Sequence, residues 1–465
     1  MTAPNLAGLI LAAGKGTRMK SDLPKGLHEV AGVPMVQLVG DAVRAAGASS
    51  PVVVVGYKGE LVREAMGSAD YRYAEQTEQL GTGHAALVAA DHFKDFEGPI
   101  LVTPGDTPLL SATTLAALVA QLHTEKAQVA MATFVTVEPG SYGRIVRDEK
   151  GHVAAIVEAK DALPEQMQIL EVNPAVYVFD SKLLFEVLPT LKNANSQGEY
   201  YLTDAIAEIR KRGGKVVATV FDDPDEFMGV NDRWQLAEAS RIMRLRILRY
   251  HAMNGVTIVD PSSTYIGQEV RIEPDVTIQP MTVIEGSTRI SAGAQLGPNA
   301  WIKDSTIGKG CRVFMSHIDQ ATMDDESRCG PFSNLRPGTR LGNKVKVGNF
   351  VEIKNSQIGD KTAISHLTYI GDATVGSETN IGAGTITCNY DGYSKNKTEI
   401  GSGTFVGSNS TLIAPVKIGD GAFIAAGSVV THDVPDDAMA VGRARQENKE
   451  GWAASWRERQ SARRS

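Results

Sequence analysis

Two glycines and two basic residues near the start of the chain could bind a phosphate. Gly14 and Gly16 follow the apolar run Leu6–Leu11, and Arg18 and Lys25 come soon after. Glycines let backbone N–H groups approach an anion closely, and the two side chains supply fixed positive charge. The turn is not a Walker sequence, and it does not complete the Gly-x-Gly-x-x-Gly fingerprint of dinucleotide sites. A glycine turn alone would equally suit plain structure, so its function depends on the residues around it.

A carboxylate that could hold a metal ion follows a second apolar run. Asp106 comes after Ile100–Val102, in the segment Gly105–Leu109. A carboxylate at the end of a buried strand is well placed to hold Mg²⁺ against a triphosphate. The same aspartate would also suit a turn or a helix cap.

A candidate for proton transfer, His366, lies in the second half of the chain. It stands between Ile364 and Ile370, two positions of the six-residue repeat described below, so its side chain can point outward. Near neutral pH a histidine can take a proton from an ammonium group and free the amine to attack a thioester. Taken alone, such a histidine would more often be an ordinary surface residue.

An aliphatic residue returns at every sixth position through most of the second half. The runs are Ile266, Ile272, Ile278, Ile284, Ile290, Leu296 and Ile302, then Leu335, Leu341, Val347 and Ile353, then Ile358, Ile364 and Ile370, and finally Ile400, Val406, Leu412, Ile418, Ile424 and Val430. This period matches neither a helix nor a simple strand. It predicts a chain that turns a corner every six residues, with three sides to each coil of a triangular parallel β-helix.

The repeat has two interruptions, at Asp319–Asn334 and between Ile386 and Ile400. A solenoid tolerates insertions as loops that leave its surface, so we expect a loop at each of them. The second contains the polar and aromatic segment Cys388–Lys397, which suits a binding loop.

The first half alternates short apolar runs with helical patterns, which predicts an α/β domain with a mainly parallel sheet. Expected strands are Leu6–Leu11, Pro51–Gly56, Ile100–Thr103 and Gln128–Val137, and expected helices are Met35–Ala46, His84–Asp91 and Ser111–Thr124. Ligands of such sheets bind beyond the carboxyl ends of the strands, where the glycine turn stands.

We therefore expect an α/β domain at residues 1–230, a linker helix at 231–253, a β-helix at 254–437 and a basic tail at 438–465. The linker helix is rich in arginine, as a spacer between domains would be. The tail carries Trp452 and Trp456, and we expect it to pack near a bound cofactor or a neighbouring subunit.

Composition excludes several classes of protein. The net charge of −7 argues against a nucleic-acid-binding protein, which needs a broad basic face. No apolar run is long enough to predict a membrane span, and no secretory signal is expected at the N-terminus. The three cysteines are widely spaced, which favours idle thiols in a reducing cytoplasm.

The string Leu11–Met19 with Pro24-Lys25 resembles the signature of sugar-1-phosphate nucleotidylyltransferases. The resemblance implies a Rossmann-like fold, catalytic roles for Arg18 and Lys25, and Mg²⁺ held by Asp106 and Asn231. The segment Gln76–Ala85 is similar to the family's uracil- and ribose-contacting loop. The implied contacts to UTP and the UDP-sugar are Leu11, Ala12, Ala13, Gly14, Gly16, Lys25, Gln76, Gly81, Thr82, Gly143, Glu158, Asn173, Tyr201, Thr203 and Asn231. Pro104 departs from relatives that carry tyrosine there.

The repeats resemble the left-handed parallel β-helix of hexapeptide-repeat acyltransferases, most of which are trimers with active sites between neighbouring subunits. The repeat region also contains, in this order, the segments Arg336–Gly338, Val351–Lys354, His366–Tyr369, Asn380–Gly384 and Asn389–Gly392. Together with the first half, these segments resemble the family of bifunctional N-acetylglucosamine-1-phosphate uridylyltransferase/glucosamine-1-phosphate acetyltransferases. That family implies His366 as the base and a homotrimer that uses glucosamine-1-phosphate, acetyl-CoA and UTP. The implied contacts to glucosamine-1-phosphate are Arg336, Lys354, Tyr369, Asn380 and Lys395, and those to acetyl-CoA are Ala383, Asn389, Tyr390, Ser408, Ala426 and Arg443.

Two alternatives remain open at this point. The protein could be a nucleotidylyltransferase whose repeats only form a trimer or regulate it, although His366 and Cys388–Lys397 speak against a mere scaffold. It could also be a non-enzymatic scaffold that binds sugar nucleotides, which the set Arg18, Lys25, Asp106 and Asn231 disfavours.

Overall fold

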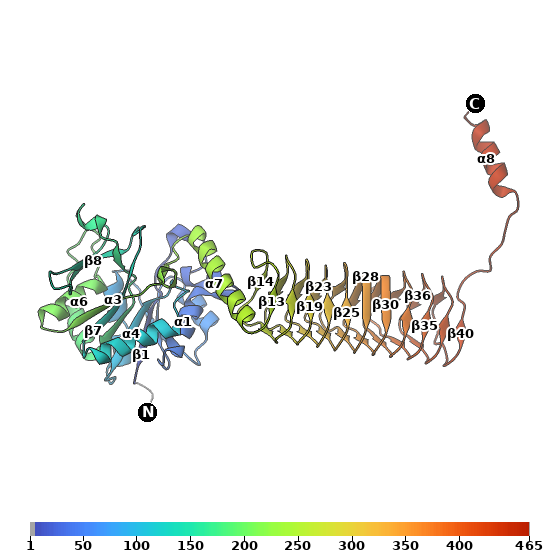
Figure 1. The fold of residues 1–465 in the computed structure, drawn as a ribbon. Coiled ribbons are helices and arrows are strands. Elements are labelled where there is room, and N and C mark those ends of the chain that lie inside the picture. Colours follow the sequence, from blue (N-terminus) through green and yellow to red (C-terminus); the bar gives the residue numbers. More distant parts are fainter. Residues whose placement is uncertain (1–4, 465) are drawn as a thin grey trace. The chain divides into compact units, whose positions relative to one another are not determined.

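The computed structural model describes residues 5–464 and divides the chain into two compact units, with the boundary between Arg246 and Ile247. Residues 1–4 of the expected first domain and residue 465 of the expected tail lie outside the described residues. Figure 1 shows an α/β unit in blue to green and a coiled β unit in yellow to red. Each unit is considered separately below.

The first unit is built on one mixed sheet with the strand order β5-β4-β1-β6-β11-β7-β10-β8-β9, and β12 pairs with β7. The strands are β1 (Ala7–Leu11), β4 (Val52–Val55), β5 (Arg72–Glu75), β6 (Pro99–Pro104), β7 (Val129–Val135), β8 (Gly143–Arg147), β9 (Val153–Val157), β10 (Glu171–Asn173), β11 (Tyr177–Asp180) and β12 (Val216–Val220). A small hairpin joins β2 (Glu29–Val30) and β3 (Val33–Pro34).

The sheet is parallel only in part. β5, β4, β1 and β6 are parallel neighbours, as predicted, but β11 runs antiparallel to both β6 and β7. β10, β8 and β9 continue the sheet through antiparallel pairs. The expectation of a mainly parallel sheet was therefore wrong for β11, β10, β8 and β9, whereas β12 again pairs in parallel, with β7.

Two apolar cores cover the two faces of the sheet. Successive residues of a strand point to opposite faces, so Ile10 joins one core and Leu9 the other. One core includes α1 (Met35–Ala45) and α4 (Ala112–Thr124), and the other includes α3 (Thr82–Leu87), α5 (Ser181–Val187) and α6 (Leu202–Lys211). Helix α2 (Gly59–Met66) contributes Val62 to the first core. β1 and β6 lie side by side in the middle of the sheet and run parallel, so their carboxyl ends lie at the same edge.

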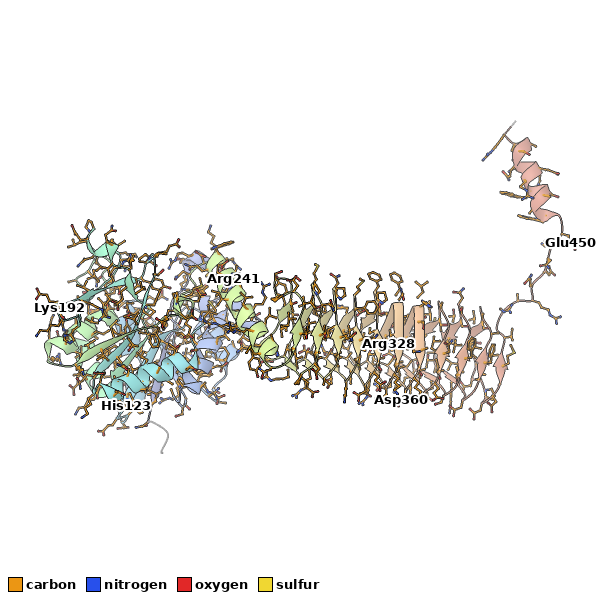
Figure 2. The ribbon with its side chains drawn as sticks, viewed as in Figure 1. His123, Lys192, Arg241, Arg328, Asp360 and Glu450 are labelled. Atoms are coloured by element: carbon orange, nitrogen blue, oxygen red, sulfur yellow. The ribbon has the colours of Figure 1, made fainter. Side chains whose placement is uncertain are left out.

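The second unit is a parallel β-helix, whose strands β13 to β40 lie between Thr257 and Ala440 (Figure 1). Most strands contain two or three residues, while β28 (Lys346–Lys354) and β30 (Ala363–Gly371) each continue around a corner. Each strand pairs in parallel with a strand one coil away, and the paired aliphatic side chains stack inside the coils. The predicted β-helix is confirmed. Figure 2 shows the outward side chains, including Arg328 and Asp360, along the coils.

The first interruption of the repeat is not a loop. β24 (Thr322–Met323) and β25 (Arg328–Cys329) pair with strands of the coils before and after them. Met323 and Cys329 are fully buried in the core, where they take the inward positions of aliphatic residues. The expected loop was therefore wrong, because methionine and cysteine fill a core as well as the aliphatic residues do.

The second interruption does leave the coil. The segment 389–397 lies between β33 (Ile386–Cys388) and β34 (Thr398–Ile400). Ile364 pairs with Ile381, and Ile381 pairs with Val406, so this coil is longer than the one before it. The loop prediction is confirmed here.

Helix α7 (Arg233–Met253) spans the boundary between the units and covers the predicted linker. Ala239 and Ile242 pack with residues of α1 in the first unit, and Leu248 belongs to the core of the β-helix. After the last coil, α8 (Trp452–Ala462) stacks the rings of Trp452 and Trp456, with centroids 6.4 Å apart. None of the helices within residues 5–464 has the length and apolarity needed to cross a membrane.

Candidate active sites

A cleft of about 580 Å³ opens at the carboxyl ends of β1 and β6. Its lining includes nearly all residues predicted to contact the nucleotide, sugar or metal: Leu11, Ala12, Ala13, Gly14, Gly16, Arg18, Lys25, Gln76, Gly81, Thr82, Asp106, Gly143, Glu158, Asn173, Thr203 and Asn231. Tyr201 is the exception. It is 8% exposed, and its hydroxyl accepts a hydrogen bond from Gln197 and donates one to Asp161.

The glycine turn is shaped by close contact with Lys25. Gly16 has φ of +66°, and a Cβ at this position would lie 2.6 Å from the Cβ of Lys25. The turn is joined to the neighbouring strand because the Gly105 N–H donates to the Leu11 carbonyl at 2.9 Å. Glycine at position 16 therefore lets the lysine reach the end of β6, where Asp106 stands.

Four polar side chains meet at that point. The Lys25 ammonium donates to the Asp106 carboxylate and, at 2.8 Å, to Oδ1 of Asn231. The Arg18 guanidinium donates to the same Asn231 oxygen at 2.8 Å. Val230 N–H donates to the Asp106 carbonyl at 2.9 Å, which holds the asparagine beside the aspartate. Two oxygen ligands and two fixed cations thus converge on one place in the cleft.

A buried carboxylate marks another part of the cleft. Glu158 accepts a hydrogen bond from the Thr203 hydroxyl at 3.3 Å. Burial raises the pKa of Glu158, and the nearby Asp161, Asp204 and Glu199 raise it further, although the Thr203 hydrogen bond opposes them. Asn173 donates to the hydroxyl of the buried Tyr177 at 2.7 Å. These groups offer acceptors and donors to a polyhydroxylated ligand.

The β-helix gathers a second polar cluster on one side of its coils. Arg336, Lys354 and Gly371 occupy equivalent positions on successive coils, because Leu335 pairs with Ile353, which pairs with Ile370. Arg336 donates to Glu352 at 2.7 Å. The hydrogen bond and charge of Lys354 lower the pKa of the adjacent Lys395. Cations held this close together favour a dianionic ligand.

Gly371 makes room for two of the predicted ligand-binding groups. A Cβ at this position would lie 2.4 Å from the Tyr369 hydroxyl and 2.8 Å from the Asn389 amide nitrogen. A side chain there would therefore displace both groups.

One member of this cluster was not singled out from the sequence. Asp372 is 8% exposed, and it accepts hydrogen bonds from the side-chain amides of Asn355, at 2.6 Å, and Asn389. Its carboxylate also lies 3.6 Å from the Lys354 ammonium. Asp372 therefore connects the coil to the first residue of the 389–397 loop. Its positive φ of 50°, uncommon for a residue other than glycine, is visible only in the structure.

The remaining predicted residues lie around the neighbouring corner. His366 is exposed on β30, beside Leu367 at the corner. Asn380 is exposed in β32 (Asn380–Ile381), paired with Ala363. Within residues 5–464, no hydrogen bond joins either side chain to Lys354 or Tyr369. Leu367, with φ of +47°, marks the corner that separates His366 from Tyr369 along β30.

The residues predicted to contact acetyl-CoA, other than the loop residues Asn389 and Tyr390, follow one another along the coils. Asn409 N–H donates to the Ala383 carbonyl at 2.7 Å, and Gly427 N–H donates to the Ser408 carbonyl at 2.8 Å. The next coil places Arg443 beside Gly427. Ala383, Ser408, Ala426 and Arg443 thus form a row along the coil axis, as an elongated ligand requires.

Full-length similarity decides the family. The chain is 50% identical over 447 residues to "Bifunctional protein GlmU" of Carboxydothermus hydrogenoformans, which covers 96% of this chain and 100% of that protein. This chain belongs to the GlmU family. A GlmU of Streptococcus agalactiae serotype III is 47% identical over 96% of this chain and 97% of its own length.

Two domain families match within this chain. The MobA-like NTP transferase domain matches residues 8–209, and six bacterial transferase hexapeptide repeats match residues 397–432. A crystal structure of UDP-glucose pyrophosphorylase complexed with UDP-glucose aligns with 52% of the chain and 98% of its own, at 20% identity and a TM-score of 0.43. The domain matches confirm the predicted pairing of a nucleotidyltransferase domain with a hexapeptide-repeat β-helix.

Proposed function

We propose that this GlmU-family chain acetylates glucosamine-1-phosphate with acetyl-CoA and then transfers UMP from UTP to the N-acetyl product. The products of the second step are UDP-N-acetylglucosamine, for cell-envelope synthesis, and pyrophosphate. The observation that carries the proposal is the convergence of Lys25, Arg18, Asp106 and Asn231 in one cleft. The cluster around Lys354 supports the acetyl-transfer half.

In uridylyl transfer, a sugar phosphate oxygen attacks the α-phosphorus of UTP in line with the departing pyrophosphate. The attacking oxygen is already an anion, so no general base is required. Arg18 and Lys25 stabilise the charge on the phosphates, and Glu158 and Thr203 orient the sugar hydroxyls. The chain's contribution is to position both reactants and to stabilise the charge that develops between them.

Magnesium fits the donor set of this cleft. Asp106 and Asn231 offer one carboxylate and one amide oxygen that already converge on a cation, the Lys25 ammonium. Hard oxygen ligands in this number suit Mg²⁺, which takes its remaining ligands from phosphates and water. When bound there, Mg²⁺ neutralises charge between the two phosphates.

In acetyl transfer, His366 takes a proton from the amino group of glucosamine-1-phosphate, and the amine attacks the thioester carbonyl of acetyl-CoA. Arg336, Lys354 and Lys395 bind the sugar phosphate, with Tyr369 and Asn380 beside it. Ala383, Asn389, Tyr390, Ser408, Ala426 and Arg443 contact acetyl-CoA. The acetyl group passes to nitrogen, and CoA leaves as the thiol.

We also propose that the active molecule is a homotrimer. The corner beside His366 carries the exposed apolar side chains of Phe332, Phe350 and Leu367 on successive coils, and Met281 is exposed at the same corner of an earlier coil. Exposed apolar patches of this kind mark interfaces. A neighbouring copy against this corner would complete a site that one chain divides between two sides. The free cysteines Cys311, Cys329 and Cys388 suit a cytoplasmic protein.

The test supplies the full-length protein with glucosamine-1-phosphate, acetyl-CoA, UTP and Mg²⁺, omits each in turn, and follows CoA and pyrophosphate. His366→Ala should abolish CoA release and leave pyrophosphate release from supplied N-acetylglucosamine-1-phosphate intact, and Asp106→Ala should do the reverse. His432→Ala and Asp95→Ala, both at exposed positions, are the matched controls. Normal CoA release by His366→Ala would refute the assignment of the base. A wild-type protein that releases only pyrophosphate would support the scaffold role for the repeats.

A further inference from the structure

Gln76 is a buried residue whose side-chain amide contributes to the lining of the cleft. It follows β5, and its backbone N–H donates to the Val55 carbonyl at 2.8 Å, which continues the pairing of β4 with β5. The side chain is 5% exposed and contributes to the cleft. The backbone of Gln76 is therefore fixed, and only the orientation of its amide decides whether the cleft meets a donor or an acceptor.

Two neighbours of the Gln76 amide nitrogen settle that orientation. Nε2 lies 3.1 Å from the Gly81 carbonyl oxygen and 3.1 Å from Nδ1 of His84. A backbone carbonyl only accepts hydrogen bonds, so the amide nitrogen must face Gly81. Its second hydrogen then points to His84 Nδ1, which has to be the unprotonated nitrogen of the imidazole. Within residues 5–464, the amide oxygen Oε1 receives no hydrogen bond and is left to serve a ligand.

The start of helix α3, which carries both acceptors, is tied to a second segment. Gly83 N–H donates to the Tyr200 carbonyl at 2.7 Å, and Tyr200 N–H donates to the Leu80 carbonyl at 2.8 Å. Gly81 has φ of +104°, and a Cβ there would meet the Tyr200 carbonyl at 2.6 Å. The two acceptors for the Gln76 amide, at the N-cap and in the first turn of helix α3, are therefore held in place by the segment at Tyr200.

We infer that His84 is a positioning residue for base selection: with the Gly81 carbonyl, it holds Gln76 so that Oε1 faces the base. This inference rests on the proposed uridylyl transfer. A fixed acceptor selects a pyrimidine whose ring nitrogen carries a hydrogen. Uracil presents N3–H to Oε1, whereas cytosine presents the lone pair of its N3. A site built around one hydrogen bond strongly disfavours the analogue that cannot make it.

Removing the acceptor on His84 should weaken the selection of uracil over cytosine, because the flipped orientation of the Gln76 amide becomes less unfavourable. With Nδ1 gone, the flipped amide loses one hydrogen bond instead of two, and its nitrogen can then donate to N3 of cytosine. His84→Phe keeps the ring but has no acceptor, and His84→Asn keeps an acceptor oxygen attached to Cγ, where Nδ1 is attached. The pair of variants separates the hydrogen bond from the volume of the side chain.

The experiment measures kcat/KM of the full-length protein for UTP and for CTP, with N-acetylglucosamine-1-phosphate, by pyrophosphate release. One hydrogen bond predicts that His84→Phe lowers the UTP/CTP ratio about tenfold, while His84→Asn keeps it within about twofold of wild type. His84→Leu provides a second variant without an acceptor should the phenylalanine not fit. Circular dichroism and thermal unfolding report whether each variant is folded, and CoA release reports that the other unit is unaffected.

An unchanged ratio in His84→Phe and His84→Leu overturns the inference, and so does an equal fall of the ratio in all three variants. If the wild type releases pyrophosphate from UTP and every variant keeps the wild-type UTP/CTP ratio, only the role of His84 is refuted. A wild-type protein that releases no pyrophosphate from UTP would instead refute the proposed function, and with it this inference.

Discussion

Replacing Asp372 by asparagine should impair acetyl transfer by releasing the 389–397 loop and Lys354. The buried carboxylate accepts hydrogen bonds from Asn355 and Asn389 and lies 3.6 Å from the Lys354 ammonium. An asparagine keeps one acceptor oxygen and turns an NH₂ group toward the other donor. One charge-assisted hydrogen bond is lost, and the other becomes a neutral one.

The magnitude follows from those two bonds. Hydrogen bonds to charged groups contribute about 1.5–3 kcal/mol each and neutral ones about 1, so the loss of one and the weakening of the other cost about 2–5 kcal/mol. This free energy orders Lys354 and Asn389, and each 1.4 kcal/mol is a factor of about ten, so its lower end of about 2 kcal/mol predicts that KM for glucosamine-1-phosphate rises at least about thirtyfold. kcat should change less, because His366 lies on the other side of the corner.

The assay is CoA release as a function of glucosamine-1-phosphate concentration, with pyrophosphate release as the measure of the first unit. Asp360→Asn is the matched control. Asp360 also accepts hydrogen bonds from an asparagine of a neighbouring coil, Asn343, but its side chain is exposed (Figure 2). A KM within twofold of wild type for Asp372→Asn, or an equal rise in Asp360→Asn, would refute the positioning role.

The same substitution should also show a defined pH dependence. Burial by itself would raise the pKa of Asp372, but hydrogen bonds from Asn355 and Asn389 and the charges of Lys354 and Lys395 outweigh it, so the pKa lies below the ordinary value of 3.8. A lowered pKa contributes stability that is present above pH 3.8 and is lost as the pH falls through the folded-state pKa. The difference in stability between wild type and Asp372→Asn should therefore be full at neutral pH and shrink in acid.

Three further predictions concern stability and the first unit. Glu158→Gln should raise Tm at pH 7, because burial raises the pKa of Glu158 and its ionised form therefore costs stability above the folded-state pKa. The gain in Tm should vanish below pH 4.5, and a lower Tm at pH 7 would contradict the prediction. Ile353→Ala, at a fully buried inward position of the β-helix, should lower the free energy of unfolding by about 2–5 kcal/mol in urea titrations, and a loss below about 1 kcal/mol would show that the coils relax around the cavity. Gly81→Ala should reduce pyrophosphate release while sparing CoA release, because a Cβ would lie 2.6 Å from the Tyr200 carbonyl; normal kinetics in both assays would mean that the loop yields at no cost.

Regular features of the fold could be predicted from the sequence, because each is repeated many times. The six-residue spacing marks the residues that point into the coils. Because the same spacing recurs along the repeat, for example at Ile266, Ile353 and Ile424, the β-helix can be predicted from many positions. Met323 and Cys329 escaped the pattern because a rule based on aliphatic residues does not count them, although they fill the core. The antiparallel return through β11 escaped because Tyr177–Asp180 is as apolar as a parallel strand, and strand direction leaves no mark on composition.

Site residues divide in a similar way. Gly14, Gly16, Lys25 and Asp106 stand in contiguous motifs whose spacing can be read directly, and the structure brings them to one cleft. Asp372 contacts asparagines of other coils, and His84, although it lies in the segment Gln76–Ala85, contacts Gln76 from helix α3; the sequence spacing shows neither contact. Their roles depend on which polar atoms share a buried space, and this becomes visible only when the coils and loops are in place.

The pairing of each β-helix strand with the next coil has a consequence for how the chain acquires its shape. Ile284 pairs with Ile302, and Ile302 pairs with Ile318, so every contact of this kind closes over a short stretch of chain. Short closures are fast, and a solenoid grows by adding one unit to a formed neighbour. Because synthesis proceeds from the N-terminus, the coils can be laid down in order as they leave the ribosome. The cluster around Lys354 becomes complete only after Lys395 has been made, and the row that ends at Arg443 follows later still.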